Sequence, residues 1–161
     1  MEIRSLKIED TRKLKSFYQE LGKSSKWVLF EDNENAYEGI RNYIEKIINN
    51  PKSICIVSLV DEQIVGHITG EVSTYKKKDH IMILSTGMVG KHTYIWTKMY
   101  DTFLIKAKEI GIHKIECSVA ETNYRIIQIC LAKGFLFEGH KADSINMNDR
   151  FIGEYIFGKV L

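Results

Sequence analysis

The sequence predicts a mixed α/β (α+β) fold, in which a mostly antiparallel central sheet is flanked by about four helices. Three observations predict it. Stretches with apolar residues at helical spacing alternate with β-branched runs, polar turns separate neighbouring runs, and no repeat or linker interrupts the 161 residues. The expected element order is β-α-α-β-β-β-α-β-α-β-β, and a chain of this length fits a single domain over residues 1–161.

The first half of the chain is expected to form a strand, two helices and a hairpin. Residues 3–8 form a short strand, after which apolar residues recur at helical spacing up to Gly22, which is expected to end the first helix. A loop leads to a second helix, which ends before Asn49-Asn50-Pro51. Two β-branched runs, residues 53–60 and 64–72, flank a short polar gap, and this pattern predicts a hairpin.

The second half is expected to alternate strands with helices and to close with two strands. Apolar positions from Ile95 to Ile110 fall on one helical face, and Gly111 follows as a cap. Residues 113–119 alternate apolar and polar side chains, as a strand with one buried face does. The other expected elements are a strand at 81–84, a helix at 124–133, and strands at 135–139 and 151–160 around the polar turn 146–149.

The composition indicates a globular protein. The chain is 44% hydrophobic and 27% charged and has a single proline, which excludes a disordered or fibrous class. A net charge of +2 does not indicate a nucleic-acid partner. The charged start, Met1 to Lys7, lacks the apolar core of a signal peptide, and no window of about 18 apolar residues follows. We therefore expect no membrane partner and a cytoplasmic location.

The spacing of the cysteines and histidines indicates which redox and metal chemistry to expect. The cysteines, Cys55, Cys117 and Cys130, are odd in number and widely separated, which favours free thiols. The five histidines include no pair at the three- or four-residue spacing of a helical metal site. We expect no metal.

The stretch Glu121 to Phe135, followed by Glu138-Gly139, is the most distinctive part of the sequence. Asn123 stands where a strand gives way to a helix, Gly134 stops that helix, and Phe135 begins another strand. This stretch resembles the signature that closes the core of the GNAT superfamily of N-acetyltransferases. Several shorter matches occur in the family's order: Ile3-Arg4, Val65-Gly66, Leu84 to Met88, and Tyr155.

The resemblance implies transfer of an acetyl group from acetyl-CoA, as cosubstrate, directly to an amine of a small molecule or peptide. That chemistry needs a bound pyrophosphate, a polarised thioester carbonyl, a neutral attacking amine and a proton for the leaving thiolate. The family holds the pyrophosphate with an Arg/Gln-x-x-Gly-x-Gly/Ala loop that opens a helix.

The residues that correspond to this loop lack its glycines. They are Lys91, His92, Thr93, Tyr94, Ile95 and Trp96, followed by Thr97, so the two small positions hold Tyr94 and Trp96. One interpretation is that the backbone amides of residues 91–96 still face the phosphates. The other is that Tyr94 and Trp96 fill an empty cleft as core aromatics. The backbone of Met88 and Val89 is expected to polarise the thioester, and Asn123 is either a cofactor contact or a helix cap.

The proton-transfer groups also depart from the family. Ile83 occupies the place of the usual carboxylate base and cannot accept a proton. His80, Glu71 and the loop Glu31-Asp32-Glu34 are substitutes, or else solvated surface groups, and an amine can also lose its proton to water. The family's proton-donating tyrosine corresponds to Cys130, which is either the donor or a small buried hydrophobe.

Trp27, Phe30 and Glu31 either line an amine pocket or cap the core. Two classes of function follow. The chain is a cytoplasmic N-acetyltransferase, or it is a non-catalytic GNAT-fold binding or regulatory protein that lost the loop glycines and the catalytic tyrosine. The sequence leaves the acceptor and the oligomeric state open, a homodimer included.

Overall fold

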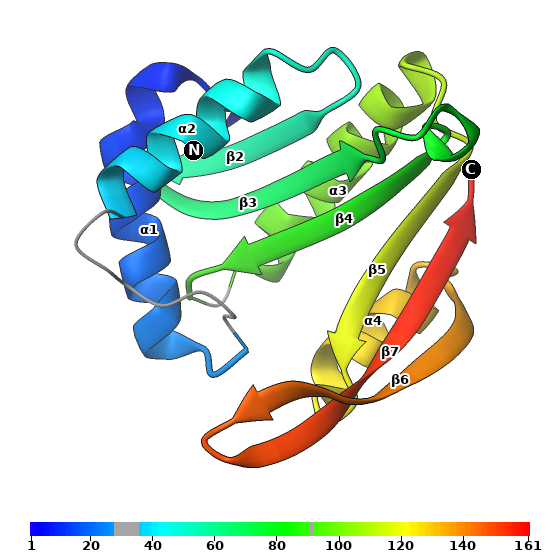
Figure 1. Cartoon of the computed structure of the whole chain (residues 1–161). Helices are drawn as coiled ribbons and strands as arrows, with labels where there is room; N and C mark the ends of the chain where they lie inside the picture. The colour runs from blue at the N-terminus through cyan, green and yellow to red at the C-terminus, as the bar shows by residue number, and fades with distance from the viewer. Residues whose placement is uncertain (28–35, 91) are drawn as a thin grey trace. The chain divides into compact units, whose positions relative to one another are not determined.

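The structure, a computed structural model, describes residues 1–27, 36–90 and 92–161. Contacts divide the chain into two compact units, each assembled from two separate stretches of sequence. The first unit holds residues 1–72 and 84–111, and the second holds residues 73–83 and 112–161. Figure 1 labels the elements of both. The single domain expected over residues 1–161 stays a prediction.

The first unit contains a sheet of β1 (Glu2–Ser5), β2 (Ile54–Val60), β3 (Gln63–Val72) and the end of β4 (Ile81–Met88). β2 pairs antiparallel with both β1 and β3, and β3 and β4 run in opposite directions (Figure 1). β2 is buried along almost its whole length. A strand buried on both faces needs helices on both sides of the sheet.

Three helices supply this cover. α1 (Thr11–Ser24), which follows a 3₁₀ turn at Ile8–Asp10, and α2 (Ala36–Ile48) pack together on one face, and α3 (Thr93–Glu109) packs on the other (Figure 1). The apolar stripe of the first two helices closes a core with β2 and β3, made of Leu6, Leu14, Phe17, Leu21, Ile44, Ile47, Cys55, Val57, Leu59 and Ile64.

Gly22 does not end the first helix, so that prediction was wrong. α1 continues to Ser24, and Ser25 donates its N–H to the carbonyl of Leu21. Glycine ends a helix where its backbone turns into the left-handed region. Gly111 and Gly134 do so, each with a φ of 79°, whereas Gly22 is not among the positive-φ residues.

The second unit contains the start of β4, β5 (Lys114–Ala120), α4 (Tyr124–Ala132), β6 (Leu136–Met147) and β7 (Arg150–Val160), with a 3₁₀ turn at Lys76–Lys78. β5 runs parallel to β4 over Ile81–Ile83 and antiparallel to β7, which also pairs with β6. Hydrogen-bonded neighbours give the sheet the order β1-β2-β3-β4-β5-β7-β6.

The predicted fold class is confirmed, with element ends that shift. In the described part of the chain the sheet has seven strands, mostly antiparallel, and the α-helices number four. β4 extends to Met88, and α3 begins at Thr93 rather than near Ile95. β6 extends far beyond the expected 135–139, because register irregularities let it stay paired with β7 past its polar residues.

Candidate functional site

The end of β4 belongs to the sheet of the first unit and leads toward α3. The N–H of Val89 donates to the carbonyl of Val65 on β3, at 2.9 Å, so this amide is engaged. Successive residues of an antiparallel strand point their backbone groups to opposite edges. The backbone of Met88 therefore points away from β3. β4 pairs with β5 over Ile81–Ile83, before it enters the first unit.

The start of α3 presents amides that the helix itself does not use. His92 is the N-cap residue, and the first intrahelical bond runs from the Trp96 N–H to the His92 carbonyl, at 3.1 Å. The N–H groups of residues 93–95 precede that bond and so have no acceptor within the helix. Together with the positive end of the helix dipole, they suit an anion. Lys91, the other predicted contact before this helix, lies outside the described residues.

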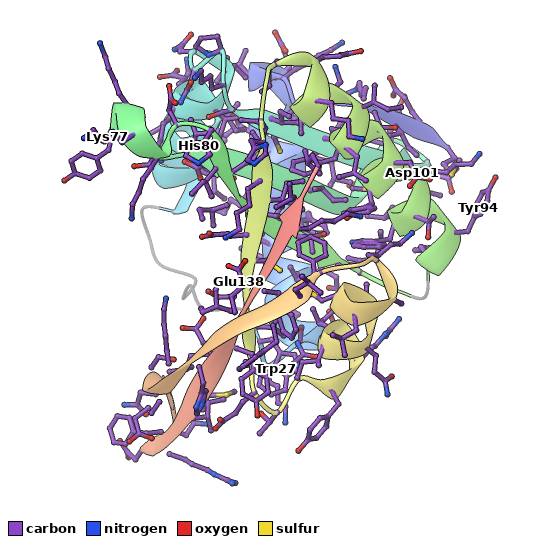
Figure 2. The ribbon with its side chains drawn as sticks, turned by 90° about the vertical axis from the view of Figure 1, so that its right-hand side faces the viewer. Trp27, Lys77, His80, Tyr94, Asp101 and Glu138 are labelled. Carbon is purple, nitrogen blue, oxygen red and sulfur yellow. The ribbon has the colours of Figure 1, made fainter. Side chains whose placement is uncertain are left out.

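Tyr94 does not fill a cleft. Its side chain is 66% exposed and points away from the body of the first unit (Figure 2), with the Lys98 Nζ 4.6 Å from the centre of its ring. The bulky side chain at this small position therefore does not pack into the first unit. The interpretation of Tyr94 as a core aromatic is wrong.

Trp96 instead fastens α3 to the sheet. Its indole N–H donates to Thr86 Oγ1 at 3.0 Å, and that hydroxyl donates to the carbonyl of His67 at 2.8 Å. The indole also stacks on Tyr100, with ring centres 5.2 Å apart. Of the other predicted contacts at this helix start, Ile95 is buried and Thr97 is half-buried.

His67 is a buried histidine that the sequence patterns did not single out. It is 4% exposed, and its ring meets the edges of Phe17 and Tyr18 on α1. Its Nδ1 lies 3.2 Å from Thr69 Oγ1, and burial lowers its pKa to about 4, so the ring is neutral near pH 7. The available signal was a single imidazole inside the β-branched run of residues 64–72.

Gly87 on β4 packs closely against Leu21 of α1 and against the His67 ring. A Cβ placed there would lie 2.7 Å from Leu21 Cδ2 and 3.1 Å from His67 Nε2, so these side chains would have to shift to admit a larger residue. The glycine therefore allows β4 to approach α1 closely just before Met88.

The predicted bases and substrate contacts lie on several elements of both units. Ile83 is 51% exposed and brings no ionisable group. The Glu71 carboxylate forms an ion pair with Lys46 of α2, and the His80 ring lies 6.1 Å from that of His113. Trp27 is half-buried, with the Lys26 Nζ 4.7 Å from its ring centre. The remaining substrate contacts, Phe30 and Glu31, lie outside the described residues, as do Asp32 and Glu34.

In the second unit, Asn123 begins α4 as predicted. Its carbonyl accepts the N–H groups of Ile126 and Ile127, both at 3.1 Å. Its half-buried side chain makes no capping hydrogen bond with the described first turn. The side-chain amide of Asn123 therefore does not cap the helix, which leaves it available to another partner.

Cys130 is buried on the opposite end of the same helix. Its Sγ lies 3.8 Å from the Sγ of Cys117 on β5. This contact and burial raise the pKa of Cys117, so the pair holds at least one proton near pH 7. The arrangement fits both interpretations of Cys130, as a packed small residue and as a thiol that carries a proton.

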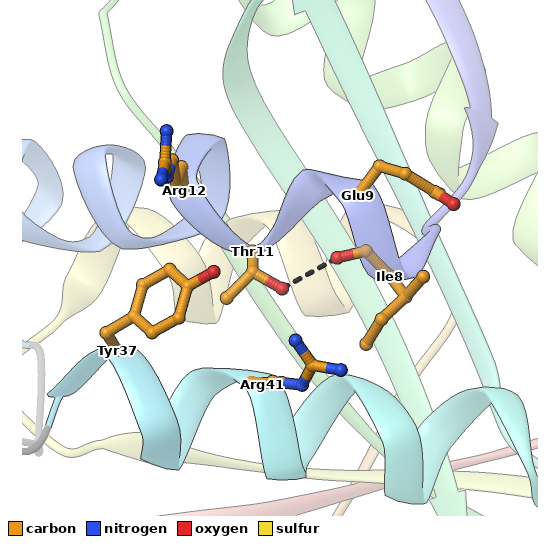
Figure 3. Close-up of a pocket in the computed structure, with 6 residues that line it drawn as sticks. All are labelled: Ile8, Glu9, Thr11, Arg12, Tyr37 and Arg41. Atoms are coloured by element: carbon orange, nitrogen blue, oxygen red, sulfur yellow. Dashed lines mark hydrogen bonds between the residues drawn. The ribbon is translucent and has the colours of Figure 1, made fainter.

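A cavity of about 410 Å³ lies elsewhere in the first unit, between the start of α1 and α2 (Figure 3). It is lined by Ile8, Glu9, Thr11, Arg12, Tyr37 and Arg41. Thr11 donates its hydroxyl to the carbonyl of Ile8 at 2.7 Å, and Arg41 donates to Glu45. None of these residues belongs to the predicted cofactor site.

Two further features of the described residues concern metal ligands and membrane-spanning helices. Across residues 1–27, 36–90 and 92–161, no three or more His, Cys, Asp or Glu side chains gather as metal ligands would. Among the helices described, none combines the length and apolar character needed to cross a membrane.

Comparisons with known proteins agree with this architecture. A family model described as an acetyltransferase (GNAT) domain matches residues 3–156. A search of curated proteins finds no match. Among solved structures, an acetyltransferase of the GNAT family from Streptococcus pneumoniae superposes with a TM-score of 0.87 at 17% identity, covering 99% of both chains.

Two other solved structures carry more specific names. A ribosomal-protein-alanine N-acetyltransferase from Brucella melitensis has a TM-score of 0.87 at 17% identity and covers 100% of both chains. A GNAT phosphinothricin acetyltransferase from Sinorhizobium meliloti, in complex with AcCoA, has a TM-score of 0.85 at 13% identity, covering 99% of this chain and 88% of that one. Because the family model spans nearly the whole sequence, the chain belongs to the GNAT family of acetyltransferases.

Proposed function

We propose that the protein is an N-acetyltransferase that transfers the acetyl group of acetyl-CoA directly to an amine of a small molecule or peptide. The observation that carries the proposal is the start of α3. There the amides of residues 93–95 have no acceptor within the helix, and the large side chain of Tyr94 points away. A pyrophosphate can accept hydrogen bonds from these N–H groups although both glycines of the family's loop are absent.

Each unit supplies its own part of the proposed chemistry. In the first unit, the Met88 N–H would polarise the thioester carbonyl, and the start of α3 would hold the pyrophosphate, with His92 and Lys91 adding polar contacts. In the second unit, the Asn123 side chain would bind the cofactor, and the Cys130 thiol would give a proton to the leaving thiolate. Trp27, Phe30 and Glu31 would contact the acceptor amine.

The acceptor classes to test follow from the named neighbours. One is named for an alanine of a ribosomal protein, and the other for phosphinothricin. Peptide amino termini and small-molecule amines are therefore both candidates. Polyamines and amino sugars widen the panel of small-molecule amines.

A non-catalytic binding protein is the second candidate. It is favoured by an apolar, 51% exposed Ile83 at the base position, and by a Cys130 thiol that is turned onto Cys117. Such a protein would bind acetyl-CoA and transfer nothing.

The test is turnover with acetyl-CoA and the amine panel, followed by release of free CoA thiol and by mass spectrometry of the acetylated amine. Transfer to at least one amine is expected. Binding of acetyl-CoA without transfer to any amine would establish the second candidate instead.

The role of Cys130 is tested in the same assay. Cys130→Ala removes the proton donor and is expected to lower kcat about 10²-fold, the lower end of what a positioned acid contributes. Cys117→Ala keeps the Cys130 thiol and serves as the matched control, with kcat within a few-fold of wild type. An unchanged kcat in Cys130→Ala would leave Cys130 as a packing residue.

A further inference from the structure

A carboxylate and an imidazole are joined in the second unit, next to Asn123. Glu121 follows β5 and lies two residues before Asn123. His140 lies nineteen residues after Glu121, on β6. His140 Nε2 is 2.8 Å from Glu121 Oε2, and the Gly153 N–H donates to Glu121 Oε1 at 2.8 Å. Each carboxylate oxygen of Glu121 therefore has a hydrogen-bond partner.

Several features show that this pair is built into the fold rather than formed by chance at the surface. The Glu121 N–H donates to the Gly153 carbonyl at 2.9 Å, so these residues are held together twice. A Cβ at Gly153 would lie 2.8 Å from both Glu121 Oε2 and the Lys141 carbonyl, and it would also meet the His140 ring. Only glycine leaves room for the pair at this point of β7.

The neighbouring strands also fix the imidazole. The His140 ring packs edge-on against Tyr155, its direct partner on β7, with ring centres 5.2 Å apart. The register of β6 shifts between Lys141 and Ile145, just beyond His140. Such bulges re-aim a side chain beside a functional site.

The hydrogen bond to Glu121 determines which nitrogen carries the proton. An ionised carboxylate only accepts, so Nε2 donates, and in the neutral ring Nδ1 therefore keeps its lone pair. The Gly153 N–H, with a further contribution from His140, holds the pKa of Glu121 below its ordinary value, and this keeps the carboxylate ionised. The His140 side chain is 42% exposed, so its Nδ1 belongs to a ring that reaches solvent.

We propose that His140, oriented by Glu121, is the general base that takes a proton from the acceptor ammonium. The inference rests on the proposed acetyl transfer and supplies the base that Ile83 cannot provide. Glu71 is a weaker candidate because its carboxylate is paired with Lys46. Glu121 is a positioning residue, since it acts through His140, as a carboxylate does in other His-based sites.

The proton balance is complete with the groups named. The ammonium R–NH₃⁺ gives one proton to His140 Nδ1, which later releases it to solvent. The neutral amine attacks the thioester carbonyl, the C–N bond forms and the C–S bond breaks. The Cys130 thiol gives its proton to the departing sulfur, and the second proton of the nitrogen returns to Cys130 through solvent, so the products are the amide and CoA–SH.

Within the second unit, the groups near His140 come from three strands. Glu121 comes from the end of β5, and Tyr155 comes from β7 with Glu154 beside it, in register with Lys141. On its own strand, Glu138 is already bound to Lys114 at 2.7 Å. The pH dependence expected below therefore involves Glu121, Glu154, Lys141 and Tyr155 as charged or titratable neighbours.

The first test does not depend on activity. Nitrogen-15 NMR of the imidazole rings, with His140→Gln used to assign the signals, is expected to show that the neutral His140 ring carries its proton on Nε2 and not on Nδ1. Glu121→Gln is expected to change that tautomer balance. A neutral His140 ring that carries its proton on Nδ1 in the wild type would overturn the assignment.

The second test uses the acetyl-transfer assay with two kinds of amine. With an alkylamine, which is an ammonium near pH 7, His140→Gln is expected to lower kcat about 10²-fold and to remove the rise of kcat with pH. With a hydrazine or aromatic amine, which is already neutral, the loss is expected to be within a few-fold. His113→Gln, a histidine of the same unit outside the pair, is expected to match wild type with both amines.

Failure of the base assignment is distinct from failure of the proposed function. If the wild type acetylates the alkylamine and His140→Gln retains its kcat and pH profile, the base assignment alone is overturned. If the wild type transfers acetyl to no amine, both are overturned.

Discussion

Asn123 opens α4, yet its side chain makes no bond to the described first turn of the helix that it precedes. A capping asparagine contributes about 1 kcal/mol to stability through such a bond. Without it, the residue type at this position needs another explanation. Cofactor binding is the explanation that we propose, and a single substitution separates it from helix capping.

Asn123→Ala is expected to change the free energy of unfolding of the ligand-free protein by no more than about 0.5 kcal/mol. The Kd for acetyl-CoA is expected to rise about 3- to 10-fold, the net value of one lost hydrogen bond. Calorimetry and urea unfolding measure the two quantities. Gln128→Ala, an exposed change on the same helix, is the control. A loss of stability near 1 kcal/mol with an unchanged Kd would return Asn123 to a purely structural role.

Asp10 ties β1 to the first helical turn of the first unit. Arg4 binds its two oxygens at 2.6 and 2.8 Å, and the Lys7 N–H donates to it at 2.9 Å. Burial alone would raise the pKa of Asp10, but the Arg4 and Lys7 hydrogen bonds lower it on balance. The ionised form is thus favoured by folding, so its stabilisation is present above about pH 3.9 and is lost as the pH falls through the folded-state value.

Asp10→Asn is expected to cost about 1–3 kcal/mol of unfolding free energy near neutral pH, because it removes the buried carboxylate and leaves Arg4 with only the exposed Glu2 as a charged partner. The difference from wild type is expected to shrink in acid, where the wild-type carboxyl is also neutral. Urea unfolding of both proteins across a pH series measures it. A difference that stays constant down to about pH 3 would contradict the linkage.

At the scale of elements, a glycine late in a helical pattern ends α4 but does not end α1. Gly134 ends α4 in a Schellman motif, in which the Phe135 N–H donates to the Cys130 carbonyl and the Gly134 N–H to that of Leu131, both at 3.0 Å. The φ of Gly134 is 79°, and the buried Phe135 follows it. Gly22 has polar residues after it, and α1 continues. An apolar residue after the glycine is the local feature that distinguishes the two.

The same substitution at these glycines is expected to have opposite effects. Gly134→Ala forces a side chain into the left-handed region and is expected to cost about 1–2 kcal/mol. Gly22→Ala has open space around its Cβ and is expected to stabilise the protein by about 0.5–1 kcal/mol. Urea unfolding of the two variants side by side measures both signs. A destabilised Gly22→Ala would mean that α1 needs a glycine there after all.

At the scale of the whole molecule, the element order was predictable because each strand and helix carries its own periodicity. The length of β6 was not, since its pairing with β7 depends on register shifts near Lys141 that no local pattern records. The parallel pairing of β4 with β5 likewise joins residues far apart in the sequence.

The residues of the candidate site also differ in how far the sequence could predict them. Asn123 and the start of α3 stand at element boundaries, which local sequence signals can locate. The direction of Tyr94 required the structure, because a residue type does not say which way its side chain leaves a helix. The Glu121 and His140 pair is formed by residues nineteen positions apart, with Gly153 a further contact, and so depends on the folded sheet.

The central claim is that a chain without the loop glycines still binds acetyl-CoA. Thermal unfolding with and without acetyl-CoA tests it most directly, with S-acetylpantetheine, which lacks the pyrophosphate, as the control ligand. At about 100 times the Kd, acetyl-CoA is expected to add roughly 2.7 kcal/mol of stability and to raise the midpoint by roughly 5–10 °C. S-acetylpantetheine is expected to give a much smaller rise. No rise with millimolar acetyl-CoA would contradict the claim.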